Sequence, residues 1–199
     1  MTTTAEIDRI LLDGRPPVVR LRTFATLLAE ESGLGTEGMT LVGGSAIEIY
    51  TQGDSVSGDV DLLVSDRERA ASVLRKWGFR DEGKLLTKDS LGLVVDLRAV
   101  ANSGSRRLTR VIRTKYGGIR VAGVEDLVLQ RLREVRFWKQ GDDAYAQAVL
   151  LVERYGRELD WEYIGFFSKK ESLENLVDDL RRRAGLPPSE PDRKDRLRE

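Results

Sequence analysis

Two residue types are missing from this 199-residue chain, which contains no cysteine and no histidine. Without cysteine the protein forms no disulfide bond and has no thiolate chemistry. Without histidine it lacks the commonest general base and the usual zinc ligand. Any chemistry must therefore rest on carboxylates, hydroxyls, lysine, arginine and backbone groups. A bound metal is then expected to be a hard cation that prefers oxygen ligands, such as Mg²⁺ or Mn²⁺.

The chain also lacks an excess of charge of either sign. It has 33 basic and 33 acidic residues, so no global field attracts it to nucleic acid or to a membrane surface. No apolar run is long enough to span a bilayer, and residues 1–6 do not resemble a signal peptide. These absences predict a cytoplasmic protein without a membrane partner.

The apolar pattern predicts an α+β protein in which a mixed helix-and-strand part precedes a helical part. Helices are expected over residues 5–12, 18–31, 45–51 and 66–77. Strands are expected over 39–42, 58–64 and 118–122, with a hairpin of 84–87 and 91–100 around Lys88-Asp89-Ser90. The later helices are expected over 124–139, from Asp142 to Tyr155, after Asp160, and from a capping box at Ser168–Glu171.

This pattern divides the chain into three parts. Residues 1–122 are expected to form the α/β domain with its N-terminal helices, and residues 123–186 to form the C-terminal helical region. Residues 187–199 begin with two prolines and are then rich in charged residues, which predicts a disordered tail.

Two aspartates interrupt the apolar segment Gly58–Val64. Strands seldom contain aspartate, and a carboxylate beside valine and leucine lies near a core unless something binds it. Alternation along a strand places Asp59 and Asp61 on one face, with Cα atoms about 7 Å apart. The spacing therefore predicts that their oxygen atoms converge on a divalent metal ion.

A third carboxylate, Asp96, lies in a similar apolar setting within Leu93–Leu97. If its strand neighbours that of Asp61, Asp96 lies about 5 Å to the side. Three carboxylates suit a site for two metal ions about 4 Å apart, and Asp96 is then also placed to take a proton from an attacking hydroxyl. The alternative is that Asp59, Asp61 and Asp96 are edge-strand or turn residues that face water.

A glycine turn precedes the aspartates. Gly43 and Gly44 follow an expected strand and open an expected helix, where backbone amides bind phosphate and glycine allows close approach. Ser45 is expected to add a hydroxyl to that phosphate site. The alternative is a plain strand-to-helix turn with Ser45 as the N-cap, and the spacing to Glu48 fits a capping box. The turn is not a Walker A loop, since no Gly-Lys-Ser/Thr follows it.

Basic residues are concentrated between Arg98 and Arg120, where seven occur without an intervening acid. Ser103 and Gly104 indicate that the segment starts as a loop. It is a candidate contact for a triphosphate or an RNA backbone, with Arg106 and Arg107 as the expected nucleotide-binding residues. The alternative is a solvated surface, which is the usual role of a charge run.

Taken together, Gly43-Gly44-Ser45, Asp59-x-Asp61 and the later Asp96 resemble the DNA polymerase β-like nucleotidyltransferase superfamily. More narrowly, the chain is similar to small nucleotidyltransferases related to the AbiEii toxins of type IV toxin–antitoxin systems. In that group a Gly-Gly turn and an Asp-x-Asp strand precede a helical segment with a Glu-Asp-Leu stretch, here Glu125-Asp126-Leu127. The resemblance covers roughly residues 39–180.

The resemblance implies a palm-like mixed sheet and metal-dependent transfer of a nucleoside monophosphate from an NTP, with release of pyrophosphate. Asp59, Asp61 and Asp96 would ligate Mg²⁺ or Mn²⁺, and Gly44 and Ser45 would hold the phosphates. The acceptor stays open among RNA such as tRNA, a protein hydroxyl and a small molecule. A toxin role with a cognate antitoxin rests on analogy alone. The alternative is a catalytically degenerate module that binds a nucleotide or a partner protein without transfer.

Overall fold

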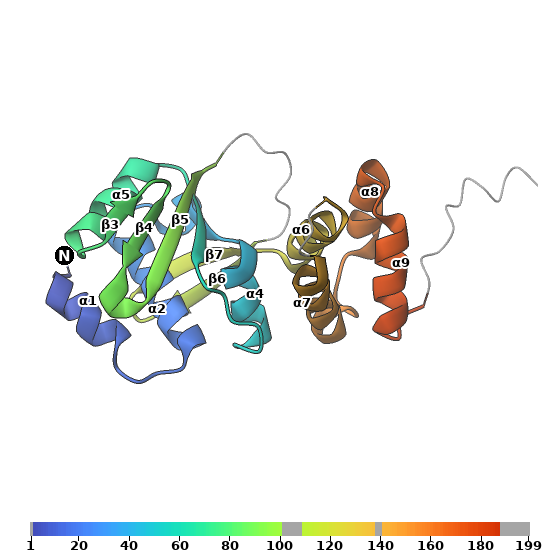
Figure 1. Cartoon of the computed structure of the whole chain (residues 1–199), viewed down its shortest axis with the longest axis horizontal. Coiled ribbons are helices and arrows are strands. Elements are labelled where there is room, and N and C mark those ends of the chain that lie inside the picture. The colour runs from blue at the N-terminus through green and yellow to red at the C-terminus, as the bar shows by residue number, and fades with distance from the viewer. Residues whose placement is uncertain (1, 101–108, 138–140, 188–199) are drawn as a thin grey trace, which may run out of the picture. The chain divides into compact units, whose positions relative to one another are not determined.

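The computed structural model describes residues 2–100, 109–137 and 141–187, which belong to two compact units. The first unit is Met1–Gly123 and the second is Val124–Glu199 (Figure 1). The tail expected to be disordered lies outside the described residues from 188 onward. The helices of the first unit are α1 (Thr4–Leu11), α2 (Pro17–Glu31), α3 (Gly35–Gly38), α4 (Gly43–Thr51), α5 (Arg67–Lys76) and the 3-10 turn η1 (Asp89–Leu91).

Seven strands of the described part form one mixed sheet in the order β3-β4-β5-β2-β1-β7-β6. Strand β2 runs parallel to β5 and antiparallel to β1, which in turn runs parallel to β7. The expected hairpin is present, because β4 and β5 pair in antiparallel fashion across η1. The α+β class is therefore confirmed. The strands are β1 (Met39–Leu41), β2 (Val60–Val64), β3 (Arg80–Glu82), β4 (Leu85–Lys88), β5 (Leu93–Ala99), β6 (Thr109–Thr114) and β7 (Gly117–Ala122).

One face of the sheet packs against helices. Val60, Leu62 and Val64 of β2 are buried, whereas Leu63 between them is partly exposed. Helices α2, α4 and α5 contact the strands, and α2 also contacts α4 and α5. Because side chains alternate along a strand, Asp61 and Leu63 point to the face opposite the one that the buried valines and leucine share.

Aromatic packing and a buried ion pair hold the helices to the sheet. Phe24 of α2 contacts the rings of Trp77 and Phe79, with centroids 6.0 and 5.9 Å away. Lys88 of β4 is 7% exposed; its ammonium pairs with Asp8 of α1 and donates to the Trp77 carbonyl at 2.7 Å. The pair fixes α1 against the end of β4, because a buried ammonium is costly unless it is fully paired.

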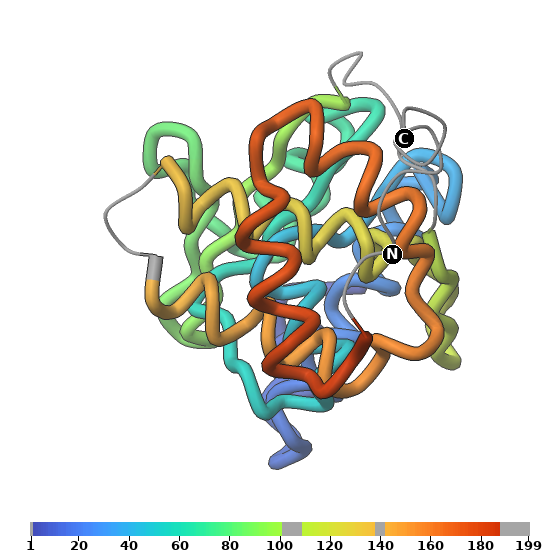
Figure 2. The backbone as a smooth tube through the Cα atoms, turned by 90° about the vertical axis from the view of Figure 1, so that its right-hand side faces the viewer, coloured from blue at the N-terminus to red at the C-terminus, as the bar shows by residue number. Residues whose placement is uncertain are grey.

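The second unit is helical, as expected for this part of the chain. Its described helices are α6 (Val124–Phe137), α7 (Gly141–Tyr155), α8 (Trp161–Glu171) and α9 (Glu174–Arg183). Helices α8 and α9 follow each other at the red end of the tube in Figure 2, and α9 contacts both α7 and α8. An ion pair between Arg133 and Glu171 joins α6 to α8, and Tyr145 donates to Asp179 to join α7 to α9.

Helix starts match the predictions in part. Asp160 caps α8 as expected, since its side chain accepts from the Tyr163 amide at 2.9 Å. The capping box expected at Ser168–Glu171 is wrong, because these residues form the last turn of α8 and α9 begins at Glu174 without a side-chain cap. Across the described ranges no helix is both long and apolar enough to cross a membrane.

Two strands, β3 and β6, were not expected from the sequence. The three residues of β3 are all exposed, so they show no apolar alternation. Strand β6 carries Arg110 and Arg113, and its Val111 is 44% exposed. Both strands lie at an edge of the sheet that the described residues form, and edge strands tolerate charged side chains.

Candidate active site

The Asp61 carboxylate lies against the glycine turn, at a position that only glycine fits. Helix α4 begins at Gly43, which has a φ of +60°, a conformation that side-chain-bearing residues rarely adopt. A Cβ at this position would overlap the Asp61 side chain, whose Cγ would be only 2.9 Å away. The carboxylate therefore sits beside the first turn of α4, where amides that lack a partner within the helix and the positive end of the helix dipole favour negative charge.

Ser45 connects this turn to the strand. It is fully buried, donates to the Val42 carbonyl at 2.9 Å and accepts from the Asp61 amide at 3.2 Å. The N-cap of α4 is Val42, so the capping box expected between Ser45 and Glu48 is wrong. The Ser45 hydroxyl is occupied within the protein and positions the backbone of Asp61.

Asp61 and Asp96 are direct neighbours on parallel strands. The register pairs Asp61 of β2 with Asp96 of β5, as the sequence predicts if the two strands are adjacent. Arg98, two residues after Asp96, bridges both carboxylates. Its Nη2 lies 2.8 Å from Asp61 Oδ1 and its Nε lies 2.7 Å from Asp96 Oδ2. The oxygen atoms of both aspartates thus converge on one position, which a guanidinium group fills.

The charges of several carboxylates act on Arg98 in the described part of this cluster. The hydrogen bond that Arg98 donates to Asp96 raises the pKa of the Arg98 guanidinium, burial opposes this rise, and the charges of Asp61, Asp96 and Asp59 add to it. Among the described residues, the charges of three carboxylates therefore act on Arg98. The Arg98 side chain is 54% exposed, whereas those of Asp61 and Asp96 are 11% and 19% exposed. The two carboxylates are therefore largely buried at the sheet surface, whereas the guanidinium group that pairs with them is more exposed to solvent.

Asp59 differs from the other two aspartates. Strand β2 begins at Val60, so the expected strand start at Gly58 is wrong and Asp59 precedes the strand. Asp59 is exposed, and the Ser57 hydroxyl donates to its carbonyl at 2.8 Å and to its Oδ1 at 3.3 Å. Because Asp59 precedes the strand, the alternation of side chains along β2 sets the direction of Asp61 but not that of Asp59.

The donor set fits a hard cation at Asp61 and Asp96. Within residues 2–100, 109–137 and 141–187, no three acidic side chains are grouped closely enough to hold a metal ion as they stand. Two carboxylates, however, already approach one cationic group within 2.8 Å. Oxygen ligands of this kind suit Mg²⁺ or Mn²⁺. Asp59 is the candidate third ligand, since its charge also acts on Arg98.

The other expected site residues lie elsewhere. Glu48 is buried at 4% exposure, and its Oε2 accepts from the Ser57 amide at 2.9 Å. Arg106 and Arg107, the expected nucleotide-binding residues, lie outside the described residues. Of the other basic residues in that segment, Arg110 stacks over the Tyr50 ring at 5.8 Å and Arg120 pairs with Glu37 at 2.5 Å.

Arg98 was not singled out from the sequence, although a signal for it exists. It follows Asp96 by two positions in an expected strand, so alternation places both side chains on one face. An arginine two residues from a candidate ligand on the same face is its nearest same-strand neighbour on that face. This spacing therefore indicates that Arg98, before Arg106 and Arg107, is the arginine that lies beside Asp96.

Comparison of the chain with models of protein families, with curated proteins and with solved structures finds no match.

Proposed function

We propose that this protein is a metal-dependent nucleotidyltransferase that transfers a nucleoside monophosphate from an NTP to an acceptor hydroxyl. The observation that carries the proposal is the in-register pair of Asp61 and Asp96, whose oxygen atoms converge beside the glycine turn of α4. The proposal includes a palm-like identity for the mixed sheet, in keeping with the resemblance noted from the sequence.

Each part of the site has a role in this proposal. Asp61 and Asp96 hold Mg²⁺ or Mn²⁺, with Asp59 as the third ligand. A bound divalent cation supplies charge neutralisation for the triphosphate and acidifies an attacking hydroxyl. The backbone amides of Gly43 and Gly44, at the N-terminus of α4, hold phosphate oxygens because they lack partners within the first helical turn.

The reaction forms one bond to phosphorus and breaks another. The acceptor oxygen bonds to the α-phosphorus of the NTP while the bond from this phosphorus to the bridging oxygen breaks, and pyrophosphate leaves. Asp96 takes the proton of the acceptor hydroxyl. RNA such as tRNA, a protein hydroxyl and a small molecule are the candidate acceptors, and a toxin role with a cognate antitoxin is part of the same proposal.

The test is label transfer. The protein is incubated with each NTP labelled at the α-phosphate, with Mg²⁺ or Mn²⁺, and with tRNA, a protein extract or a small-molecule extract as acceptor. We expect transfer to one acceptor, and its loss in Asp59→Ala and in Asp61→Ala. Transfer that persists in Asp61→Ala would contradict the proposal.

A degenerate binding module is the second candidate. It is favoured by Arg98, which fills the position between Asp61 and Asp96, and by the lack of a three-acid metal group in the described ranges. This candidate predicts nucleotide binding, measured by equilibrium dialysis, with no transfer to any acceptor. Binding that is insensitive to Mg²⁺ and to Asp61→Ala would favour it over the enzyme.

A further inference from the structure

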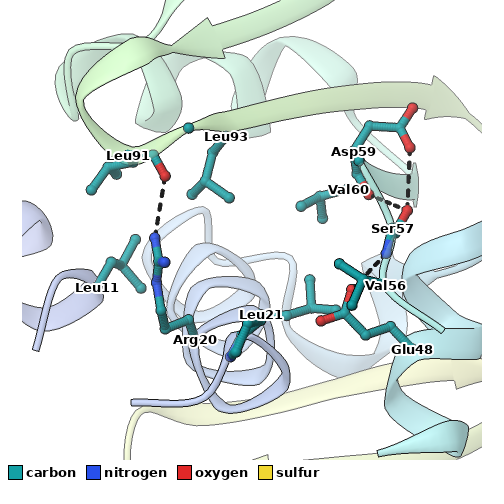
Figure 3. Close-up of a pocket in the computed structure, with 13 residues that line it drawn as sticks. Leu11, Arg20, Leu21, Glu48, Val56, Ser57, Asp59, Val60, Leu91 and Leu93 are labelled. Carbon is teal, nitrogen blue, oxygen red and sulfur yellow. Dashed lines mark hydrogen bonds between the residues drawn. The ribbon is translucent and has the colours of Figure 1, made fainter. Parts of the chain in front are cut away.

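A small cavity lies on the helix-covered side of the sheet in the first unit (Figure 3). Its volume is about 140 Å³, and segments distant in the sequence surround it. Leu11 of α1, Leu21 of α2 and Val60 of β2 form apolar walls, each at most 7% exposed. Val56, at 66% exposure, lies at its rim.

The size of the cavity limits what it can hold. An apolar cavity of about 150 Å³ holds one benzene molecule in a well-studied protein. A ring or a branched chain of similar size therefore fills the apolar part of this cavity. Part of any longer ligand has to extend out of the cavity past its rim.

Arg20 places a cation in this apolar setting. Its Nη2 donates to the Leu91 carbonyl at 3.2 Å, while its Nε is buried without a hydrogen-bond partner. In the part of the chain that the structure describes, no acidic side chain forms an ion pair with Arg20. A guanidinium group without a counter-ion, beside leucine side chains, favours a ligand with anionic oxygen atoms.

Glu48 lies on another side of the cavity from Arg20 in Figure 3. Its Oε2 accepts from the Ser57 amide at 2.9 Å, and its Oε1 accepts no hydrogen bond from the described residues. Unlike Arg20 Nε, Glu48 Oε1 is not one of the buried atoms without a partner, so a ligand can reach it. A hydroxyl or amine of a ligand can donate to this oxygen.

We propose that this cavity binds a small aromatic or branched carboxylate, about the size of benzoate, with a hydroxyl or amine at its far end. The carboxylate pairs with Arg20, the apolar body fills the space between Leu11, Leu21 and Val60, and the far donor reaches Glu48. Asp59, the third metal ligand proposed above, also lines the cavity, but none of the three ligand contacts involves it, and the test uses neither a nucleotide nor a metal ion.

The test compares three probes by protein-observed NMR on the full chain: 4-hydroxybenzoate, benzoate and phenol. We expect 4-hydroxybenzoate to bind most tightly and phenol, which lacks the anion, least tightly. Arg20→Gln is expected to weaken benzoate at least about tenfold, the worth of a charge-assisted hydrogen bond. Arg22→Gln is the matched control: its Nε is also buried without a partner, but Arg22 does not line the cavity.

A second variant separates binding from folding. Leu93→Trp fills the cavity while leaving Arg20 in place, and we expect it to abolish binding of all three probes. The proposal is wrong if no probe shifts signals of the lining residues, if phenol binds as tightly as benzoate, or if Arg20→Gln binds benzoate like the wild type. If Arg20→Gln does not fold, loss of binding in folded Leu93→Trp supports the cavity, and retained binding overturns it.

Discussion

Two clusters of the described residues, one in each unit, differ in how acids and cations are paired. In the first unit Asp61 and Asp96 both pair with Arg98; in the second, two arginines and a tyrosine contact Asp179. An acid-rich cluster in a sheet surface gains from a further cation, whereas an aspartate with several donors is already satisfied. The first group is Asp61, Asp96 and Arg98, and the second is Asp179, Tyr145, Arg182 and Arg183.

The largest expected effect comes from removing one acid of each group. Asp61→Asn should lower label transfer at least about 10³-fold, because a metal ligand contributes several kcal/mol to the transition state. Its unfolding free energy should change by no more than about 1 kcal/mol. The substitution removes the ion pair with Arg98, but it also removes the repulsion between Asp61 and Asp96, and the two effects oppose each other. Asp179→Asn should keep the activity. Equal losses of activity in both variants would show that the ratio of acids to cations in a cluster does not identify the active site.

The next effect concerns the glycine turn. Gly43→Ala should lower the unfolding free energy by about 3 kcal/mol in urea titrations, because positive φ adds to overlap with the Asp61 carboxylate. Gly83→Ala is the control, since Gly83 has a φ of +67° and an added methyl group there would meet no other atom within 4 Å. It should cost only about 1 kcal/mol. Equal losses of unfolding free energy in the two variants would mean that the Asp61 carboxylate does not pack against Gly43.

Arg98 is expected to compete with a metal ion. Arg98→Ala should tighten Mn²⁺ binding about threefold to tenfold in calorimetric titrations, because two partly exposed ion pairs no longer need to be broken. Arg75→Ala should leave Mn²⁺ binding unchanged, although Arg75 also pairs with two acids, Glu68 and Asp81. Weaker Mn²⁺ binding in Arg98→Ala would show that the arginine assembles the site instead of competing for it.

The smallest effect is a titration in the second unit. Burial, and then the hydrogen bond to Asp179, raise the pKa of Tyr145 to about 12. The neutral phenol is thus favoured by folding, so its contribution to stability is complete below about pH 10 and is lost as the pH rises through about 12. The difference in ultraviolet absorbance between wild type and Tyr145→Phe isolates this titration. A titration midpoint near the ordinary tyrosine pKa would show that Tyr145 is neither buried nor hydrogen-bonded to Asp179 as the structure has it.

The pairing of Asp61 with Asp96 could be predicted because both aspartates lie within apolar runs. Buried strands next to each other in the sheet need such runs, and alternation then fixes which side chains share a face. The place of Asp59 could not be predicted as firmly. Strand pairing begins at Val60, and the sequence Gly58-Asp59 does not mark where hydrogen bonding starts.

The capping boxes failed for a different reason. Ser45 has the right spacing to Glu48, but contact with Asp61 fixes the start of α4 two residues earlier, at Gly43. Ser168 likewise has the right spacing to Glu171 but lies inside α8. A capping motif satisfies a helix end only where packing allows the helix to end, so local pattern alone does not decide it.

The most direct test of the central claim is Mn²⁺-induced broadening of backbone amide signals in the metal-free protein. If Asp61 and Asp96 form a cation site, Mn²⁺ should broaden the amides around these residues in β2 and β5 at concentrations that leave the surroundings of Asp179 unaffected. Asp61→Asn should abolish this local effect, and Asp179→Asn should retain it. Broadening that is absent from β2 and β5, or unchanged in Asp61→Asn, would contradict the account.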